Sequence, residues 1–276
     1  MFTINCKGKL LSLDQPVVMG ILNITPDSFY EGHLDKNINE LLQLAATMIT
    51  DGALILDIGG QSSKPGSSRI SAAEESARVL PVVEAIHKSF PQTIISIDTY
   101  YAAVAKDAVA LGASIVNDIS SGSLDTEMIS TVASLNVPYI IMHMQGTPET
   151  MQQQPFYDNV VKEVLDFFIA KTDECKKADI KDIIIDVGFG FGKNRQHNFS
   201  LLKNMPVFQM LERPVLAGLS RKGMIYKTLN TTAAAALNGT TALNMLALNN
   251  GASILRVHDV KEAIECIRLF DEFSKA

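Results

Sequence analysis

The stretch Asp51-Gly52-Ala53-Leu54-Ile55-Leu56-Asp57-Ile58-Gly59-Gly60 contains a glycine, a short apolar run, an acidic residue and a glycine pair. The first glycine suits the left-handed conformation that ends a helix, and the run Ala53–Ile58 suits a strand buried on both faces. The same order recurs, with predicted helix exits at Leu111-Gly112-Ala113 and Asn250-Gly251-Ala252. The chain is therefore predicted to repeat one unit: helix, glycine, buried strand and polar loop.

Eight apolar runs alternate with segments of helical spacing, and together they predict the fold. One predicted helix carries an apolar stripe of Leu41, Leu44, Ala45, Met48 and Ile49. Ala233–Ala236 is interpreted as part of another helix that packs against the strands. Eight strands alternating with helices over roughly 250 residues predict a parallel (β/α)8 barrel, because an open doubly wound sheet usually has fewer strands and a glycine-rich first turn. The predicted strands are Val17–Leu22, Ala53–Ile58, Thr93–Ile97, Ser114–Val116, Tyr139–Met142, Ile183–Ile185, Val215–Leu219 and Ser253–Val257.

The rest of the sequence adds one small element. Residues 1–16 precede the first predicted strand, and their alternation around Lys7-Gly8-Lys9 indicates a short hairpin that covers the bottom of the barrel. No linker rich in Pro, Ser or Gly and no block of like charge divides the chain. Residues 1–276 are therefore predicted to form a single domain.

The composition argues against several classes of partner. With 24 Lys and Arg against 30 Asp and Glu, the net charge is −6, so the basic excess of a general nucleic-acid binder is missing. No apolar run approaches the roughly 18 residues of a membrane span, and the N-terminus lacks a secretory signal pattern. Cys6, Cys175 and Cys266 are far apart in the sequence, which favours a reducing cytoplasm over a disulfide framework.

Nearly every predicted strand ends on a polar side chain. Because barrel active sites lie at the carboxyl ends of the strands, these side chains are expected to meet at one mouth. A single Asp, Asn or Ser there is equally well explained as a helix N-cap, but a convergence that includes Lys and Arg favours a binding site. By charge, the mouth divides into a cationic side, suited to phosphate or carboxylate, and an acceptor side, suited to a planar heterocycle with several N–H donors. The cationic side comprises Lys64, Lys222, Arg256 and His258, and the acceptor side comprises Asp98, Asn117 and Asp186.

Two further patterns are interpreted as structural. Gly188-Phe189-Gly190-Phe191-Gly192-Lys193 resembles a phosphate loop, but Val187 and Asn194 occupy positions where a Walker A match needs Gly and Ser or Thr. The five histidines show no metal-ligand spacing, and His143, at the end of a predicted strand, is expected to be a hydrogen-bonded structural residue.

Eight blocks of sequence, in chain order from the first predicted strand to the last, form a family signature. They are Met19-Gly20-Ile21-Leu22-Asn23-Ile24-Thr25-Pro26-Asp27-Ser28-Phe29, Asp57-Ile58-Gly59-Gly60 with Pro65-Gly66, Asp98-Thr99, Asn117-Asp118-Ile119, His143-Met144-Gln145-Gly146-Thr147-Pro148, Gly188-Phe189-Gly190-Phe191-Gly192-Lys193, Ser220-Arg221-Lys222 and Arg256-Val257-His258-Asp259. In this respect the chain resembles the dihydropteroate synthase family, and the resemblance covers almost the whole chain.

The resemblance implies a (β/α)8 transferase of folate biosynthesis. Such enzymes join 6-hydroxymethyl-7,8-dihydropterin diphosphate to p-aminobenzoate and release pyrophosphate together with 7,8-dihydropteroate. The family is Mg²⁺-dependent, typically homodimeric, and inhibited by sulfonamides that mimic p-aminobenzoate. This chemistry needs no protein nucleophile, because Mg²⁺ and cationic side chains stabilise the leaving diphosphate and the neutral aniline nitrogen attacks.

Carried over by position, the resemblance assigns roles to individual residues. The implied catalytic residues are Lys222, Asp98 and Arg256. The implied pterin-binding residues are Asp98, Asn117, Ile119, Met142, Asp186 and Lys222. The implied diphosphate-binding residues are Asn23, Lys64, Arg256 and His258, with Asn23 as the metal ligand. The implied p-aminobenzoate-binding residues are Ser63, Pro65, Phe191, Lys222 and Gly223.

The chain departs from the family pattern in the second loop and beside the p-aminobenzoate pocket. Gln61, Ser63 and Lys64 stand where the family usually has Glu, Thr and Arg. Val187 and Gly223 replace a common Pro and a common Ser. The residues assigned to the pterin are unchanged.

Three other functions are compatible with the sequence. A corrinoid-type pterin-binding methyltransferase would share the barrel and the pterin pocket but lack a diphosphate site. Lys64, Arg256 and His258 indicate such a site and therefore argue against this alternative. A class I aldolase would form a Schiff base on Lys222. A pterin-binding barrel without catalysis is the third alternative.

Overall fold

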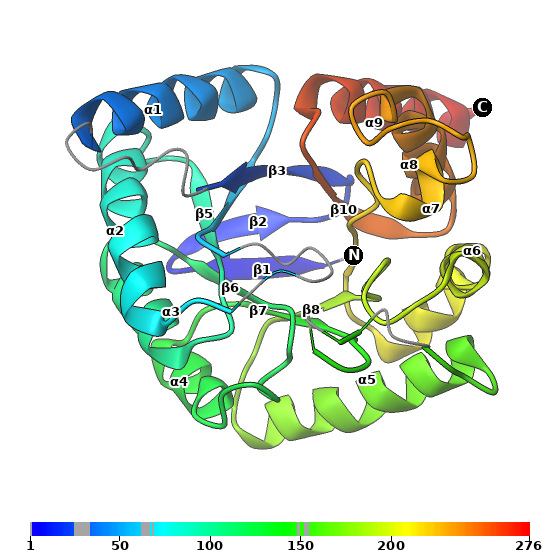
Figure 1. Cartoon of the computed structure of the whole chain (residues 1–276), viewed down its shortest axis with the longest axis horizontal. Helices are drawn as coiled ribbons and strands as arrows, with labels where there is room; N and C mark the ends of the chain where they lie inside the picture. Colours follow the sequence, from blue (N-terminus) through cyan, green and yellow to red (C-terminus); the bar gives the residue numbers. More distant parts are fainter. Residues whose placement is uncertain (1, 25–33, 62–66, 68, 148–149, 152–154) are drawn as a thin grey trace.

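Eight parallel strands close into a barrel in the computed structural model, so the predicted (β/α)8 fold is confirmed (Figure 1). The order around the barrel is β10-β3-β4-β5-β6-β7-β8-β9, in which β10 pairs with β3 to close the sheet. The structure describes residues 2–24, 34–61, 67, 69–147, 150–151 and 155–276, with the backbone alone for residues 34–37. The barrel strands are β3 (Val17–Asn23), β4 (Ile55–Gly59), β5 (Ile94–Asp98), β6 (Ile115–Asp118), β7 (Tyr139–Met142), β8 (Ile183–Asp186), β9 (Val215–Ala217) and β10 (Ala252–Val257).

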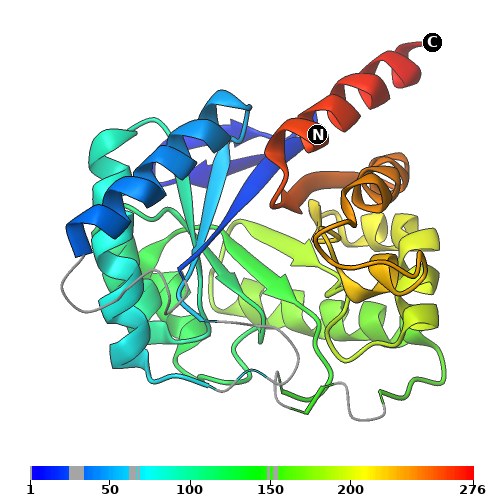
Figure 2. The ribbon, with the colours of Figure 1, turned by 45° about the horizontal axis from the view of Figure 1, so that its top comes forward.

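Helices surround the barrel on the outside (Figures 1 and 2). In α1, Leu41, Ala45 and Met48 are buried, whereas Leu44 of the predicted stripe is 44% exposed, so the buried face is narrower than predicted. None of the helices in the described part of the chain is long and apolar enough to cross a membrane. The helices are α1 (Leu34–Thr50), α2 (Ala72–Ser89), α3 (Ala102–Ala110), α4 (Met128–Leu135), α5 (Val160–Lys177), α6 (Arg195–Lys203), the 3₁₀ segment η2 (Met205–Leu211), α7 (Gly223–Tyr226), α8 (Leu237–Asn249) and α9 (Val260–Lys275).

The predicted helix exits are confirmed by the backbone. Gly52, Gly112 and Gly251 follow helices and have φ angles of +112°, +125° and +90°, a region where a side chain is strained. Each is followed within a few residues by a barrel strand. The glycines therefore separate the helix from the strand in three of the repeats.

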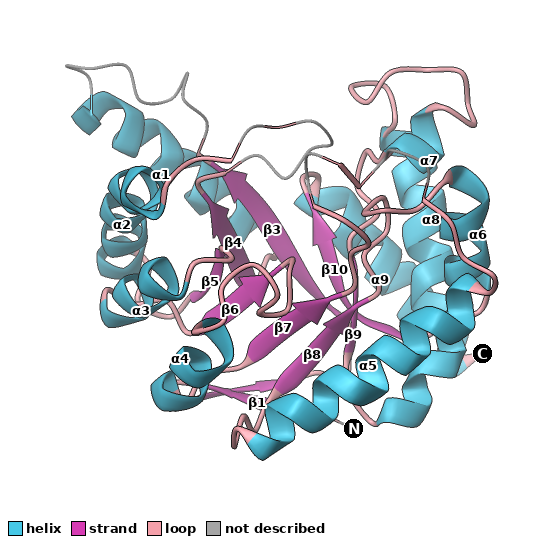
Figure 3. Ribbon diagram, turned by 60° about the horizontal axis from the view of Figure 1, so that its bottom comes forward, coloured by secondary structure: helices cyan, strands magenta, loops and turns pink. Residues whose placement is uncertain are grey.

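The N-terminal hairpin is also present, as β1 (Thr3–Cys6) paired antiparallel with β2 (Lys9–Ser12). Its inward residues Ile4, Cys6 and Leu11 are buried in one cluster with residues at the amino ends of the barrel strands, such as Val17 and Ile55. The strand arrows point away from this end of the barrel (Figure 3). The hairpin thus closes the bottom and leaves the carboxyl ends of the strands for a site.

One predicted helix is wrong. Ala233–Ala236 lies in the connection before α8, which begins only at Leu237, and Ala236 alone of the four is buried. Alanine favours helix intrinsically, but intrinsic propensity is a weak determinant beside tertiary contacts. Here the carbonyls of Ala233 and Ala234 accept hydrogen bonds from the Arg221 side chain, which holds the segment in another conformation.

Candidate active site

The sheet register aligns the ends of four neighbouring strands, three of which carry a polar side chain there. Asn23 of β3 pairs with Gly59 of β4, Gly59 with Asp98 of β5, and Asp98 with Asn117 of β6. Further around the barrel, Met142 at the end of β7 pairs with Asp186 at the end of β8. The predicted convergence of strand ends is therefore confirmed for the acceptor residues at the mouth of the barrel.

Arg256, near the end of β10, reaches across the mouth to two carboxylates. Its Nε lies 2.6 Å from Asp57 Oδ2, and its Nη2 lies 2.6 Å from Asp98 Oδ2. Asn117 Nδ2 donates to the same Asp57 oxygen at 3.1 Å. The predicted separation into a cationic and an acceptor side is therefore wrong at this position, because the guanidinium lies among the acceptors.

Burial and the neighbouring charges set the protonation of this group. Asp57 is fully buried, and its Oδ1 has no hydrogen-bond partner in the described part of the chain. Burial raises the pKa of Asp98 to about 7, while Arg256 opposes the rise and the carboxylates of Asp57 and Asp186 add to it. The acidic side chains of Asp57, Asp98 and Asp186 thus surround one guanidinium in the described part of the mouth, which suits a ligand that brings N–H donors.

Asp186 and Lys222 form the second polar pair of the mouth. Asp186 Oδ1 accepts a hydrogen bond from the Gly188 backbone N–H at 2.8 Å. Burial lowers the pKa of Lys222 to about 8, and the Asp186 carboxylate acts in the opposite direction. A Cβ at Gly218 would lie 3.8 Å from Asp186 Oδ2 and 3.9 Å from Lys222 Nζ, so the glycine leaves the space between them open.

The Lys222 side chain is positioned by the loop after β8. Its ammonium donates to the Phe189 carbonyl and lies 4.7 Å from the centroid of the Phe191 ring. A cation over an aromatic face is favourable where both groups are withdrawn from water. Lys222 therefore lies within the electrostatic influence of the Asp186 carboxylate and contacts the apolar wall of the mouth.

The apolar wall consists of one small cluster. Tyr100, Ile119 and Met142 are buried together, and Phe191 and Met144 pack against them. The resemblance assigns Ile119 and Met142 to the pterin and Phe191 to p-aminobenzoate. In the structure these three residues form one continuous apolar surface. A planar ligand lying on this surface would meet the acceptor groups of the strand ends at its edge.

Lys193 is a buried residue whose position the sequence analysis did not predict. It is 2% exposed, and its Nζ donates to the carbonyls of His143, Gly188 and Phe191, each at 3.0 Å. His143 Nδ1 lies 2.9 Å from the same nitrogen. Burial, aided by Lys193, lowers the pKa of His143 to about 3, so the imidazole is neutral. The structural interpretation of His143 is confirmed.

The glycines of the same loop explain its resemblance to a phosphate loop. Gly188 has a φ angle of +71°, and a Cβ there would lie 2.0 Å from the His143 carbonyl oxygen. The chain turns closely enough for its carbonyls to surround Lys193, so the lysine serves the loop itself. The rejection of a Walker A loop agrees with this geometry.

The other predicted residues lie around the same mouth where the structure describes them. Asn23 ends β3 and is exposed, and Gly223 begins the short helix α7 directly after Lys222. His258 follows β10, with Nδ1 2.9 Å from Ser220 Oγ. Ser63, Lys64 and Pro65 lie outside the described residues.

Asp57 and Lys193 lie at the mouth but are absent from the predicted site. Asp57 ends a predicted strand and belongs to a signature block, yet no role was assigned to it. Lys193 ends a run of alternating glycines, and nothing in the sequence indicates that its charge is buried. Their importance becomes visible only from their contacts with Arg256 and with the loop carbonyls.

The fold and the mouth define a class: a (β/α)8 barrel that binds a planar, donor-rich small molecule at the carboxyl ends of its strands. Comparison with known proteins is consistent with this class. Residues 19–258 match the family described as "Pterin binding enzyme", and the chain belongs to that family.

Individual relatives cover nearly the whole chain. Dihydropteroate synthase of Escherichia coli (strain K12) is 43% identical over 267 residues, which is 96% of this chain and 94% of the relative. The Yersinia pestis dihydropteroate synthase, solved with a sulfonamide drug complex, superposes with a TM-score of 0.94 at 39% identity, covering 100% of both chains. The Xanthomonas albilineans enzyme with 4-aminobenzoic acid gives a TM-score of 0.92 at 36% identity, covering 99% of this chain and 98% of that one.

Proposed function

We propose that this protein is a dihydropteroate synthase that joins 6-hydroxymethyl-7,8-dihydropterin diphosphate to p-aminobenzoate. The observation that carries the proposal is the buried carboxylate of Asp186 beside Lys222, at the mouth of a barrel from the pterin-binding family. A carboxylate in this environment forms charge-assisted hydrogen bonds with a planar edge of N–H donors. Relatives named for this reaction, at about 40% identity over nearly the whole chain, support the same conclusion.

We propose that the pterin lies on the apolar wall with its donor edge toward the strand ends. Asp98, Asn117, Asp186 and Lys222 hold its polar edge, and Ile119 and Met142 contact its faces. Asn117 and Asp186 are buried and Asp98 is partly buried, which supports this placement, because hydrogen bonds to a ligand are stronger where little water competes for them.

We propose that the diphosphate is bound by Asn23, Lys64, Arg256 and His258, together with Mg²⁺. In the described residues no group of three or more His, Cys, Asp or Glu side chains forms a metal site. Mg²⁺ commonly takes most of its ligands from substrate phosphates and water, so a single amide oxygen from the exposed Asn23 side chain suits it. When bound, the ion neutralises negative charge that develops on the leaving diphosphate.

We propose that p-aminobenzoate lies beside Phe191, Lys222 and Gly223, with Ser63 and Pro65 completing its pocket. The position of the Lys222 ammonium over the Phe191 ring supports this, because the cation is available for a carboxylate and the ring for an aromatic face. Gly223 is the first residue of α7.

The reaction needs one bond to break and one to form. The bond between the exocyclic CH₂ carbon and the diphosphate oxygen breaks, and its electron pair leaves with pyrophosphate. The positive charge left on this carbon is delocalised into the pterin ring, where Asp98 and Asp186 stabilise it electrostatically. The aniline nitrogen then forms the new C–N bond and loses a proton to solvent. Lys222, Asp98 and Arg256 thereby act as the catalytic residues, through charge and orientation.

Product formation tests the proposal directly. We expect dihydropteroate and pyrophosphate to form only when both substrates and Mg²⁺ are present, and a chelator to stop turnover. Turnover in the presence of chelator, or no product at high enzyme concentration, would exclude the reaction. Borohydride trapping of a carbonyl substrate on Lys222 would instead favour the aldolase alternative.

We further propose a cytoplasmic homodimer. Leu269 and Phe273 lie one helical turn apart on α9 and are 65% and 70% exposed, and Leu246 on the neighbouring α8 is 50% exposed. Large apolar side chains exposed on adjacent helices support burial against a second copy. The molar mass by light scattering tests this, because a value near the chain mass of 30.0 kDa would exclude the dimer.

A further inference from the structure

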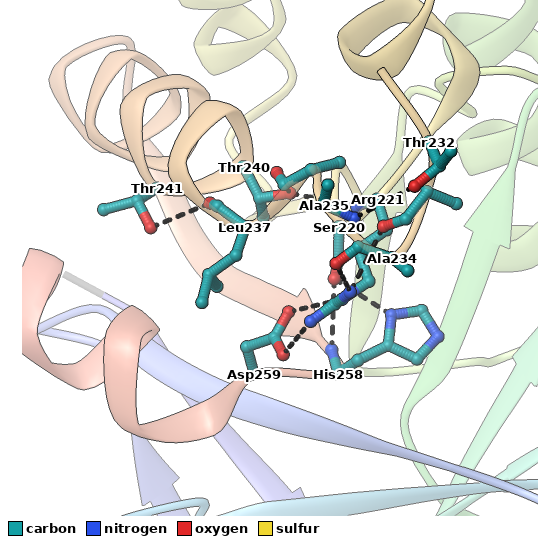
Figure 4. Close-up of polar contacts among 12 residues, drawn as sticks. Ser220, Arg221, Thr232, Ala234, Ala235, Leu237, Thr240, Thr241, His258 and Asp259 are labelled. Carbon is teal, nitrogen blue, oxygen red and sulfur yellow. Dashed lines mark hydrogen bonds and ion pairs between the residues drawn. The ribbon is translucent and has the colours of Figure 1, made fainter.

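The Arg221 side chain joins three segments beside the mouth of the barrel (Figure 4). Its Nε and Nη2 donate to the two carboxylate oxygens of Asp259, at 2.9 and 2.7 Å. Its Nη1 donates to the carbonyls of Ala234 at 2.6 Å and Ala233 at 3.2 Å. The guanidinium therefore ties the turn after β9 to the connection before α8 and to the turn after β10.

The backbone of Arg221 has a conformation that is unfavourable for arginine. Its φ angle is +55°, at the third position of a turn that the Lys222 N–H closes on the Leu219 carbonyl at 3.2 Å. Such a position favours glycine or asparagine. The Arg221 backbone N–H donates to Thr240 Oγ1 at 3.0 Å. Hydrogen bonds from both the side chain and the backbone of Arg221 therefore hold the strained turn in place. Strain that persists where the surroundings fix it is a reason to look for a function.

Two of the residues beside this pair, Lys222 and His258, are assigned to the substrates. Ser220 and Lys222 flank Arg221 in the chain, and His258 precedes Asp259. The His258 backbone N–H donates to Ser220 Oγ at 3.2 Å, and the same oxygen lies 2.9 Å from His258 Nδ1. The Arg221–Asp259 ion pair thus spans the same two turns as the contact between Ser220 and His258.

The contacts at Ser220 bear on the tautomer of His258. The Ser220 oxygen accepts from the His258 backbone N–H, and its single hydroxyl hydrogen is available to Nδ1; when the hydroxyl donates there, the neutral ring carries its proton on Nε2. An N–H on Nε2 can donate a hydrogen bond to an anion such as the diphosphate. A shift of either turn would break the Ser220 contact and allow the ring to exchange tautomers.

We propose that Arg221 is a positioning residue, which together with Asp259 fixes Lys222 and the donor tautomer of His258 for the diphosphate-bearing substrate. The identity of this substrate rests on the function proposed above, whereas the fixed tautomer does not. Arg221 itself touches Asp259 and backbone carbonyls, so its effect on turnover is transmitted through Ser220, Lys222 and His258.

Paired substitutions separate this role from a contribution to stability. Arg221→Ala removes the side chain and keeps the strained backbone, whereas Arg221→Gly removes the side chain and relieves the strain. We expect a higher Tm for Arg221→Gly than for Arg221→Ala, but a fall of at least about tenfold in kcat/KM for the pterin diphosphate in both. Asp259→Asn, which keeps the shape and removes the charge, should lower kcat/KM in the same direction. Lys162→Ala, which removes an exposed ion pair with Asp166 on α5, is the matched control and should stay within about twofold of the wild type.

The ¹⁵N NMR shifts of the His258 ring give a readout that does not depend on activity. We expect an acceptor signature at Nδ1 and a protonated Nε2 in the wild type, and averaged tautomers in Arg221→Gly. A folded Arg221→Gly variant that keeps both the wild-type ring shifts and the wild-type kcat/KM would overturn the inference. If the wild type shows the fixed tautomer but makes no dihydropteroate, the proposed function fails and the positioning role stands.

Discussion

Arg256 and Asp57 form an ion pair across the barrel mouth, with Nε 2.6 Å from Oδ2, although the two residues are 199 positions apart in the chain. Asp57 is fully buried, and the Arg256 side chain is 18% exposed. Burial of a charged group is costly unless it is paired, so each residue depends on the other. Asp98 is the second partner of the same guanidinium.

The dependence of Arg256 on Asp57 predicts the effect of Asp57→Asn. The variant keeps the shape and removes a charge, so the hydrogen bond from Arg256 weakens while Asp98 still holds the other guanidinium nitrogen. We expect a loss of about 1.5–3 kcal/mol in the free energy of unfolding, measured with urea. Glu84→Gln, at an exposed ion pair with Lys88 on α2, is the control and should change stability by less than about 1 kcal/mol. Equal effects of the two variants would show that the buried pair contributes no more than a surface pair.

Asp186→Asn tests the acceptor edge of the mouth. The amide keeps one oxygen, but it removes the charge that we propose faces the donor edge of the pterin. We expect the affinity for a pterin analogue, measured by calorimetry, to fall by about 1.5–3 kcal/mol. The affinity for pyrophosphate should change less, because the proposed site of that anion consists of other residues. Unchanged pterin affinity would leave Asp186 only its structural bond to Gly188.

The barrel could be predicted from sequence because its signals are local and repeated. A buried parallel strand needs only an apolar run, and a helix exit needs only a glycine, so the run before Asp57 and the exit at Gly52 indicate the repeat directly. Strand ends follow from the same pattern, and the register then aligns Asn23 with Asp98 and Asn117 through Gly59.

The pairing within the mouth could not be predicted, because it depends on which way long side chains point. A charge pattern assigns Arg256 to a cationic side, but the side chain is long enough to reach Asp57 and Asp98. Lysine is seldom fully buried, so the sequence does not predict that Lys193 is buried. Nor does it predict the carbonyl cage around its Nζ, which is formed by the carbonyls of His143, Gly188 and Phe191. Alanine propensity likewise gave the wrong result at Ala233–Ala236, where Arg221 holds the backbone.

Lys193→Met tests the carbonyl cage. Methionine keeps an unbranched apolar stem, but it leaves the carbonyls of His143, Gly188 and Phe191 buried without their donor. Because a buried polar group that loses its partner costs about 1–3 kcal/mol, we expect the unfolding free energy to fall by at least about 3 kcal/mol. Sulfonamide affinity should fall as well, since the loop carries Phe191 and the carbonyl that holds Lys222.

The control for this substitution is Lys203→Met. Lys203 is exposed at the end of the adjacent helix α6, so the same chemical change there should alter stability by less than about 1 kcal/mol. A Lys193→Met variant as stable as Lys203→Met would mean that the carbonyls find other partners, and the cage would then have no energetic role.

Glu75 is a buried acid of α2 beside the mouth. Its Oε2 accepts a hydrogen bond from Thr99 Oγ1 at 3.1 Å, and its Oε1 has no partner in the described part of the chain. Burial, with the nearby Asp98, raises the pKa of Glu75 to about 8, although Thr99, Arg78 and Arg69 act in the opposite direction. The carboxyl group is therefore protonated in the folded protein at neutral pH.

A proton held only in the folded state makes stability depend on pH. The unfolded chain releases this proton near pH 4.5 and the folded chain near pH 8, so the contribution of Glu75 is complete at low pH and is lost as the pH rises through this window. Glu75→Gln keeps the shape and cannot ionise. We expect the variant to lie within about 1 kcal/mol of the wild type at pH 5 and to exceed its unfolding free energy at pH 8.5 by a few kcal/mol, measured by urea denaturation. Glu74→Gln, at the exposed neighbouring carboxylate, should differ from the wild type by less than about 1 kcal/mol at both pH values. A Glu75→Gln variant that differs from the wild type by the same amount at pH 5 and pH 8.5 would show that Glu75 ionises alike in the folded and unfolded states.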